Sequence, residues 1–451
     1  MASTYLTRAM NGNSEYTGTM SLWLKRGNLG QKVIYSFWED SSTYQRLQFD
    51  SSDRLNWKIF DNGTLYGEVT TTRKFRDTSA WYHIVCRVDT TQSTASDRVR
   101  FYINGEHNVS ANNGFATENY PTQNRNVKQS AVPYIGTEGT ITSARFDGCM
   151  THVHYTDAAS NAPTVFGETD ATTGEWKIKT NVSTTYGSKG FFILKDGNSG
   201  TDHSGNSNDF TAYGTLTNTE DCPSNNFATW NILATQGNNR TMENGATYIG
   251  NNSNNYWNCL FGTLASSSGK FYCEIKDESD WGSTSDSTRR YGIVNLDASM
   301  DHRLATAVEI KFSDNNYAYA YMNASGVRHS GSTLTGTTST HPTFQEGDII
   351  MIAMDLDNNK LYFGKNGTWN NSANPASGAT GTGSVANIAD GLWTFYAETK
   401  YGSDNASANF GNGYHRTTAI SSEGTNASGI GKFEYDVPAG YTALSTKGLN
   451  L

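Results

Sequence analysis

The sequence predicts an all-β protein of two antiparallel β-sandwich (jelly-roll) domains in tandem. At 451 residues the chain is too long for a single sandwich. Its composition, with 44 Gly, 25 Tyr, 20 Phe, 10 Trp and only 17% charged residues, disfavours long helices and suits short strands whose aromatic side chains supply much of the core. Stretches of alternating apolar and polar residues also recur along the chain, separated by Gly, Ser, Asn and Asp.

The charge and hydropathy patterns exclude two classes of partner. The formal net charge is −9 and no basic run exceeds two residues, so we expect no nucleic-acid partner. Every apolar stretch is shorter than the roughly 20 residues that a membrane-spanning helix requires, so we expect no membrane insertion. The first 18 residues lack the apolar core of a signal peptide, and we therefore expect no secretory signal.

The five cysteines are dispersed along the chain and form no Cys-x-x-Cys pair. An odd, scattered set argues against a disulfide framework and against a zinc site. We therefore predict reduced, mostly buried thiols at Cys86, Cys149, Cys222, Cys259 and Cys273.

The first third of the chain reads as a series of strands. Residues 17–60 alternate in three segments, 83–86 form a strand entered from an aromatic pair, and 97–108 form a return strand. The Asn104-Gly105 pair is the strongest short signal for a hairpin turn. In this order, the segments MSLWLK, SAWYHIV, RVRFYING and RFDGCMTHVH resemble a laminin-G-like, concanavalin A-type jelly roll, over residues 1–165.

Residues 166–230 form a connector that is rich in Gly, Asn and Asp. Its two short apolar runs, 191–194 and 210–213, predict strands that cap the first sandwich. The segments around 163–230 resemble the connector between a jelly roll and a SPRY-like domain in structural proteins of marine bacteriophages. That resemblance implies an association with phage virions.

The second domain, residues 231–451, is organised around the stretch GDIIMIAMDLDNNKLYFGKNGTW at 347–369. Its apolar run and its turn residues predict a hairpin of an antiparallel sheet, with Ile350 and Ile352 in the core. This stretch resembles the core hairpin of the SPRY (B30.2-like) domain. Further matches to that family lie at 269–274, 409–411 and 433–444.

The jelly-roll superfamily includes glycoside hydrolases, which need two carboxyl groups about 5 Å apart when they retain configuration. No Glu-x-Asp-x-x-Glu cluster is present. Glu168 and Asp170 lie in a turn-rich segment and are expected to be solvated. Asp355 and Asp357 are two residues apart, so on a strand they would share a face and could hold a cation or a proton. The alternative is that Asp357 accepts hydrogen bonds from the following turn while Asp355 anchors a neighbouring loop. We predict no catalytic residues.

We also predict no metal site and no cofactor. His152 and His154 share a strand face and two imidazoles can bind zinc, but no third ligand lies at a defined spacing. The loop at 202–209 is rich in oxygen ligands that calcium prefers, but it lacks the order of an EF-hand.

Binding is the better-supported class of function. The SPRY resemblance places a recognition surface near residues 251–257, 280–291 and 369–374. Aromatic and guanidinium groups of the kind enriched in binding hot spots gather there. The alternative assigns Tyr291 and Trp257 to the core and leaves the two arginines solvated. The candidate ligand-binding residues are Trp257, Trp281, Arg289, Arg290, Tyr291 and Trp369.

Together these observations predict a non-enzymatic virion structural protein, a tail-fibre, appendage or head-decoration subunit that binds a host surface glycan or receptor protein. It would assemble with other virion proteins in the host cytoplasm, remain exposed on the particle, and form a homo-oligomer, a dimer or trimer. Because the jelly roll starts near Met1 and no heptad run is present, we favour a decoration or side appendage. The alternatives are a depolymerase on the jelly-roll fold and a protein-binding SPRY adaptor.

Overall fold

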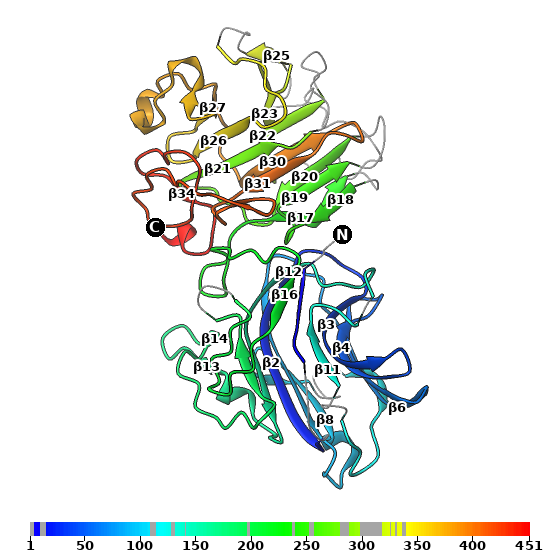
Figure 1. Ribbon diagram of the computed structural model, residues 1–451. Coiled ribbons are helices and arrows are strands. Elements are labelled where there is room, and N and C mark those ends of the chain that lie inside the picture. The colour runs from blue at the N-terminus through cyan, green and yellow to red at the C-terminus, as the bar shows by residue number, and fades with distance from the viewer. Residues whose placement is uncertain are drawn as a thin grey trace. The chain divides into compact units, whose positions relative to one another are not determined.

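The computed structural model describes residues 4–9, 15–108, 114–127, 131–139, 141–195, 199–236, 240–251, 257–279, 288–297, 318–324, 326–329, 332–335 and 340–451. The chain divides into two compact units, Met1–Asn218 and Thr219–Leu451. Each unit is built from antiparallel β-sheets (Figure 1), which confirms the predicted all-β fold of two tandem sandwiches. The boundary falls between Asn218 and Thr219, before the predicted end of the connector at residue 230.

In its described part, the first unit holds an eight-stranded sheet of order β10-β6-β5-β4-β3-β11-β1-β16 and a six-stranded sheet of order β15-β12-β2-β7-β8-β9. The strands of the eight-stranded sheet are β1 (Tyr5–Thr7), β3 (Lys32–Asp40), β4 (Thr43–Phe49), β5 (Arg54–Asp61), β6 (Thr64–Lys74), β10 (Phe115–Asn119), β11 (Val132–Ile135) and β16 (Thr211–Tyr213). Those of the six-stranded sheet are β2 (Thr17–Arg26), β7 (Trp81–Asp89), β8 (Val99–Ile103), β9 (Glu106–His107), β12 (Gly148–Asp157) and β15 (Phe191–Ile193).

The core of the first unit lies between these two sheets. Alternate residues of β5, namely Leu55, Trp57 and Ile59, are fully buried in it, as the period of two along a strand requires. The predicted hairpin at Asn104-Gly105 joins β8 to β9, and both residues have positive φ (51° and 83°), as in a type I′ turn.

As far as Asn218, the connector belongs to the first unit and packs against the jelly roll. Both of its apolar runs form strands, because β15 pairs with β12 and β16 pairs with β1. A small hairpin of β13 (Gly167–Thr169) and β14 (Trp176–Ile178) carries Trp176. A Cβ atom at Gly105 or Gly167 would lie 2.7 or 2.5 Å from the Trp176 ring, so these two glycines form the slot that receives the indole.

In its described part, the second unit holds a seven-stranded sheet of order β17-β20-β30-β22-β23-β24-β25 and a larger sheet whose main path is β18-β19-β31-β21-β26-β27-β28. The described strands of the second unit are β17 (Trp230–Gln236), β18 (Arg240–Glu243), β19 (Tyr248–Asn251), β20 (Asn258–Gly262), β21 (Lys270–Asp277), β22 (Arg289–Asn295), β23 (Ala318–Met322), β24 (Val327–His329), β25 (Ser332–Thr335), β26 (Ile349–Asp355), β27 (Lys360–Lys365), β28 (Thr368–Trp369), β29 (Ala386–Asn387), β30 (Trp393–Thr399), β31 (Ala406–Asn409), β32 (Tyr414–His415), β33 (Thr418–Ala419) and β34 (Thr442–Ala443).

Helical structure in the described residues is limited to short 3₁₀ turns. They are η1 (Ala95–Asp97), η2 (Pro163–Val165), η4 (Asn370–Ser372), η5 (Pro375–Thr380) and η6 (Gly448–Asn450). Within these residues, no helix is long and apolar enough to cross a membrane.

The central hairpin of the second unit forms as predicted. Strands β26 and β27 pair in register, and Ile350 and Ile352 are fully buried. The prediction that Asp355 and Asp357 share a strand face is wrong, because β26 ends at Asp355. Asp355 is fully buried, and its carboxylate accepts hydrogen bonds from Asn358 and pairs with Lys270 at 3.0 Å. The exposed Asp357 instead accepts a hydrogen bond from the backbone N–H of Gly269, so the expected roles of the two aspartates are exchanged.

All five cysteines are free thiols. Cys86, Cys259 and Cys273 are buried, and Cys149 and Cys222 are partly buried, as predicted for a reduced set.

Candidate functional site

The candidate residues on β22 lie on both faces of the seven-stranded sheet. Because side chains alternate along a strand, Arg290 points away from the core of the second unit whereas Arg289 and Tyr291 point to the other side. The pairing of β22 with β30 places Arg290 opposite Glu398. The sheet therefore separates the candidates into two groups with different surroundings.

Trp257 and Arg290 come together on the face away from the core. The guanidinium of Arg290 lies over the Trp257 ring at 4.1 Å from its centroid, and the ammonium of Lys400 lies 5.5 Å from the same ring. Lys400 also lies 5.2 Å from the ring of Tyr401. We call Trp257, Arg290, Lys400 and Tyr401 the Trp257 cluster. It is a partly exposed aromatic surface with two cations held against it, a combination that gives cation–π attraction.

A buried carboxylate fixes the position of Arg290. Glu398 is fully buried; one of its oxygens accepts hydrogen bonds from Arg290 at 3.0 Å and from the Tyr396 hydroxyl at 2.5 Å. The Cys259 thiol donates to the other oxygen at 3.1 Å. Burial and the nearby Glu398 carboxylate raise the pKa of Tyr396 well above its usual value, so this hydroxyl stays protonated and donates. The network holds Arg290 against the Trp257 ring.

Arg289 and Tyr291 are buried structural residues. Arg289 forms ion pairs with Asp277 at 3.1 Å and with Asp404 at 3.8 Å, and burial raises the pKa of both carboxyl groups. Tyr291 is fully buried and stacks on Phe344 with ring centroids 5.3 Å apart. The alternative that assigned Tyr291 to the core therefore describes the structure, and neither Arg289 nor Arg290 is a solvated surface charge. Arg289 and Tyr291 offer no surface to a ligand.

The two remaining tryptophans are not part of the Trp257 cluster. Trp369 lies in β28 of the larger sheet and packs in an edge contact on Tyr272, with centroids 6.2 Å apart. Trp281 lies outside the described residues. Sequence reasoning missed Lys400 and Tyr401, which directly follow β30. Both residues lie beyond the last residue of that strand, where alternation of faces no longer predicts the direction of a side chain.

Several acidic groups of the first unit pair with cations. The half-buried Asp170 and the exposed Glu168 lie 2.8 and 3.8 Å from the ammonium of Lys177. On the outer face of the eight-stranded sheet, Glu68 pairs with Lys58 at 3.1 Å and Glu138 pairs with Arg46. Burial raises the pKa of Glu138.

The acidic loop at 202–209 is held by its own hydrogen bonds. Both carboxylate oxygens of Asp202 accept bonds: one from the N–H groups of Phe192 and Ser204, the other from the N–H of Asn208 and the Ser204 hydroxyl. Within the described residues, no group of three or more His, Cys, Asp or Glu side chains is placed to hold a metal ion.

A buried serine and histidine, Ser21 and His83, lie beneath the connector. The ring proton of His83 faces Ser21, so His83 cannot act as a base toward the serine hydroxyl. The His83 Nε2 atom is 2.9 Å from the Ser21 hydroxyl, and the Trp176 indole N–H donates to His83 Nδ1 at 2.9 Å. Since an indole nitrogen can only donate, Nδ1 must accept and the ring proton lies on Nε2. His83 therefore donates to Ser21 and cannot accept its proton. Its role is to fasten the connector through Trp176.

His152 and His154 lie at a β-bulge in β12, where His152 has a φ of 50°. Their ring centroids are 6.3 Å apart. His154 stacks on Phe192 at 3.8 Å, and its Nδ1 is 2.8 Å from the Tyr186 hydroxyl. Burial lowers the pKa of His154 well below its usual value. These contacts give His154 a packing role under the connector.

Acid is expected to destabilise the first unit through His83. Burial lowers the pKa of His83 from its usual 6.5 to about 3. Below pH 6.5 the unfolded chain therefore binds a proton that the folded chain does not, and stability falls as the pH drops toward 3. At pH 5 the loss is about 2 kcal/mol from this group alone. Thermal unfolding of the first unit at pH 7.5, 6 and 5 measures this effect. His83→Gln, which cannot titrate, should make the profile shallower and leave the part that His154 contributes, and an equally steep profile in that variant would contradict the assignment.

Each of the two units contains a segment that matches a known protein family. Residues 2–166 match the concanavalin A-like lectin/glucanases superfamily, and residues 270–379 match the SPRY domain. The chain carries a concanavalin A-like domain and a SPRY domain. The central hairpin at 347–369 and the Arg289–Tyr291 strand lie inside the matched part of the SPRY domain, whereas Trp257, Lys400 and Tyr401 lie outside it.

Two solved structures align with part of the chain. The SPRY domain of human HERC1 aligns with 14% identity and a TM-score of 0.30, over 40% of this chain and 96% of that chain. The native heptameric SAP-like pentraxin from Limulus polyphemus aligns with 15% identity and a TM-score of 0.26, over 35% of this chain and 78% of that chain. No curated protein sequence matches the chain.

Proposed function

We propose that this chain is a non-enzymatic structural protein of a phage virion that binds a host surface glycan or protein through the Trp257 cluster of its SPRY domain. The virion role is supported by the resemblance of residues 163–230 to the connector in structural proteins of marine phages. As a tail-fibre, appendage or head-decoration subunit, the chain assembles with other virion proteins, as a dimer or trimer, in the host cytoplasm. It remains exposed on the particle.

The observation that carries the binding role is the geometry of the Trp257 cluster. Its aromatic ring is partly exposed, and Arg290 is held beneath the ring by a fully buried carboxylate, so the surface is rigid before a ligand arrives. Preorganised aromatic and cationic groups are typical of binding hot spots. The Lys400 ammonium forms no ion pair with another described residue and is available to a carbonyl, carboxylate or hydroxyl group of a ligand.

Trp257→Ala is expected to weaken binding about 30-fold, measured on the cells that the full-length protein recognises. A loss of this size is typical of a hot-spot residue. Lys400→Gln should weaken it by a smaller factor, because this side chain contributes only part of the surface. The measurement is the binding of fluorescently labelled protein to a panel of marine bacterial cells. Arg290 is not a suitable target, because its removal would break its ion pair with the buried Glu398 carboxylate and so disturb the fold.

The matched control is Tyr16→Ala, which removes an exposed aromatic ring from the first unit and should leave cell binding unchanged. Unaltered binding by Trp257→Ala would refute the role of the cluster. Reducing sugar released from host polysaccharide would overturn the non-enzymatic assignment in favour of a depolymerase. Mapping the protein on intact particles by electron microscopy tests the virion role, and its absence from particles would favour a cellular adaptor.

A further inference from the structure

Two arginines lie directly opposite each other on adjacent strands of the first unit. Arg87 on β7 is in register with Arg100 on β8, which places their Cβ atoms about 4.5–5.5 Å apart. Their neighbours Cys86 and Phe101 are buried in the core, so alternation directs both arginine side chains to the outer face of the six-stranded sheet. Like charges directly opposite each other destabilise a sheet unless an anion compensates them.

Within the described residues, only one of these two guanidinium groups has an anionic partner. Arg100 pairs with Asp97, which lies three residues earlier in η1. Arg87 forms no hydrogen bond or ion pair with a described residue; its Nε atom is buried, whereas its two terminal nitrogens are not. Asp89 follows on the same face of β7, but its carboxylate already accepts hydrogen bonds from side chains of the next loop at 2.6 and 2.8 Å.

A histidine lies beside the two arginines. His107 on β9 is paired with Tyr102 on β8 and stacks on its ring, with centroids 4.9 Å apart. Burial lowers the pKa of His107, the positive charges of Arg100 and Arg87 lower it further, and Asp97 raises it. The imidazole is therefore within electrostatic reach of both arginines. An anion bound between these groups would raise the pKa of His107.

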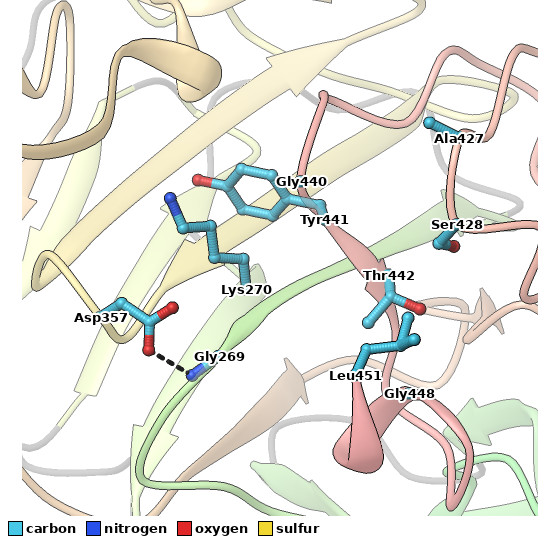
Figure 2. Close-up of a pocket in the computed structure, with 10 residues that line it drawn as sticks. All are labelled: Gly269, Lys270, Asp357, Ala427, Ser428, Gly440, Tyr441, Thr442, Gly448 and Leu451. Atoms are coloured by element: carbon cyan, nitrogen blue, oxygen red, sulfur yellow. Dashed lines mark hydrogen bonds between the residues drawn. The ribbon is translucent and has the colours of Figure 1, made fainter.

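Two cations of the second unit contrast with Arg87. Lys270 lines a pocket of about 310 Å³ on the larger sheet (Figure 2), but its ammonium pairs with the buried carboxylate of Asp355 at 3.0 Å. Arg290 likewise pairs with the buried Glu398 at 3.0 Å. Both cations are neutralised inside the fold, whereas the terminal nitrogens of Arg87 are available to an external anion.

We propose that Arg87, Arg100 and His107 form a binding site for one oxyanion group, a sulfate, phosphate or carboxylate. The planar fork of the Arg87 terminal nitrogens donates two parallel hydrogen bonds to two oxygens of such a group. Arg100 and protonated His107 add positive charge from the neighbouring strands. The bound anion offsets the repulsion between the arginines. This site lies on the jelly roll and does not depend on the function proposed for the Trp257 cluster.

An NMR titration of the full-length protein carrying isotope-labelled histidine tests this proposal, with inorganic sulfate as the probe. Sodium chloride keeps the ionic strength constant, so that screening does not change. We expect saturable shifts of the His107 ring signals and a higher pKa of His107 at saturating sulfate. Sulfate binding should tighten as the pH falls through this pKa, because the protonated ring adds a positive charge. The signals that His107→Gln removes identify the ring.

Two further probes identify the source of the oxyanion. D-glucose 6-sulfate carries the same group as a sugar ester, and D-glucuronate carries a carboxylate. Saturable binding of any of the three probes, with the rise in the pKa of His107, supports the site, and the tightest of them names its preferred ligand. No effect beyond that of chloride with any probe would overturn the proposal.

Arg87→Gln should weaken sulfate binding about tenfold or more and abolish the rise in the pKa of His107. The matched control is Arg73→Gln, because Arg73 lies on β6 of the other sheet, over the Phe75 ring, and should not contribute to binding. Binding that survives Arg87→Gln would overturn the proposal. If this variant fails to fold by circular dichroism, the pKa of His107 in the unmodified protein decides, because sulfate bound elsewhere would leave it unchanged.

Discussion

Ile352→Asp is expected to unfold the second unit. Ile352 is fully buried in the middle of β26, where it pairs with Cys273 on β21 and with Phe363 on β27. A carboxylate at this position would lie in an apolar cluster. The expected loss is about 5 kcal/mol or more, which is comparable to the 5–15 kcal/mol that stabilises a typical domain.

Guanidinium unfolding followed by near-ultraviolet circular dichroism measures this loss. The transition of the second unit should disappear while that of the first unit remains. The control is Thr368→Asp, which adds the same charge at an exposed position on β28 and should shift stability by less than about 0.5 kcal/mol. A stable, well-folded Ile352→Asp variant would show that the hairpin is not the scaffold of this unit.

Glu274→Gln is expected to release part of the closing segment of the second unit. Glu274 is fully buried on β21. One oxygen accepts hydrogen bonds from the Tyr272 hydroxyl at 2.9 Å and the Tyr435 N–H at 2.8 Å. The other accepts bonds from the Asn409 side-chain amide at 3.2 Å and the Glu434 N–H at 2.9 Å. Since all four partners donate, only a carboxylate satisfies them.

Glutamine would place an NH₂ group against two of these donors, so we expect a loss of about 3–5 kcal/mol. Hydrogen exchange should report it first at the N–H groups of Glu434 and Tyr435, because these are the bonds that the carboxylate accepts. Glu423→Gln makes the same chemical change at an exposed position and is the control. Unchanged exchange at both amides would mean that the segment is held by its apolar contacts alone.

The local structure of this protein was predictable from the sequence, because it depends on near neighbours. The apolar run at 349–354 is buried as expected, and the Asn366-Gly367 turn has φ angles of 49° and 81°, as its residues require. The position of Asp357 was not predictable, because one residue decides whether a strand continues or turns. Asp355 already ends β26, and the rule of alternate faces does not apply beyond it.

The candidate site was predictable only in part. The alternation along β22 would have separated Arg290 from Arg289 and Tyr291, and that signal is present in the sequence. The partners were not predictable, because Glu398 and Lys400 lie more than a hundred residues from Arg290 and meet it only through the pairing of β22 with β30. The contact between His83 and Trp176 is hidden for the same reason, since it joins the jelly roll to its connector.

The connector also determines how the first unit behaves in solution. Strand β15 is an edge strand of the six-stranded sheet, and β16 is an edge strand of the eight-stranded sheet. Without them, β12 and β1 would present unpaired backbone N–H and C=O groups, which are templates for aggregation. A fragment that stops at residue 166, where the family match ends, would lack both strands. The stretch that reads as a linker thus covers an edge of each sheet of the jelly roll.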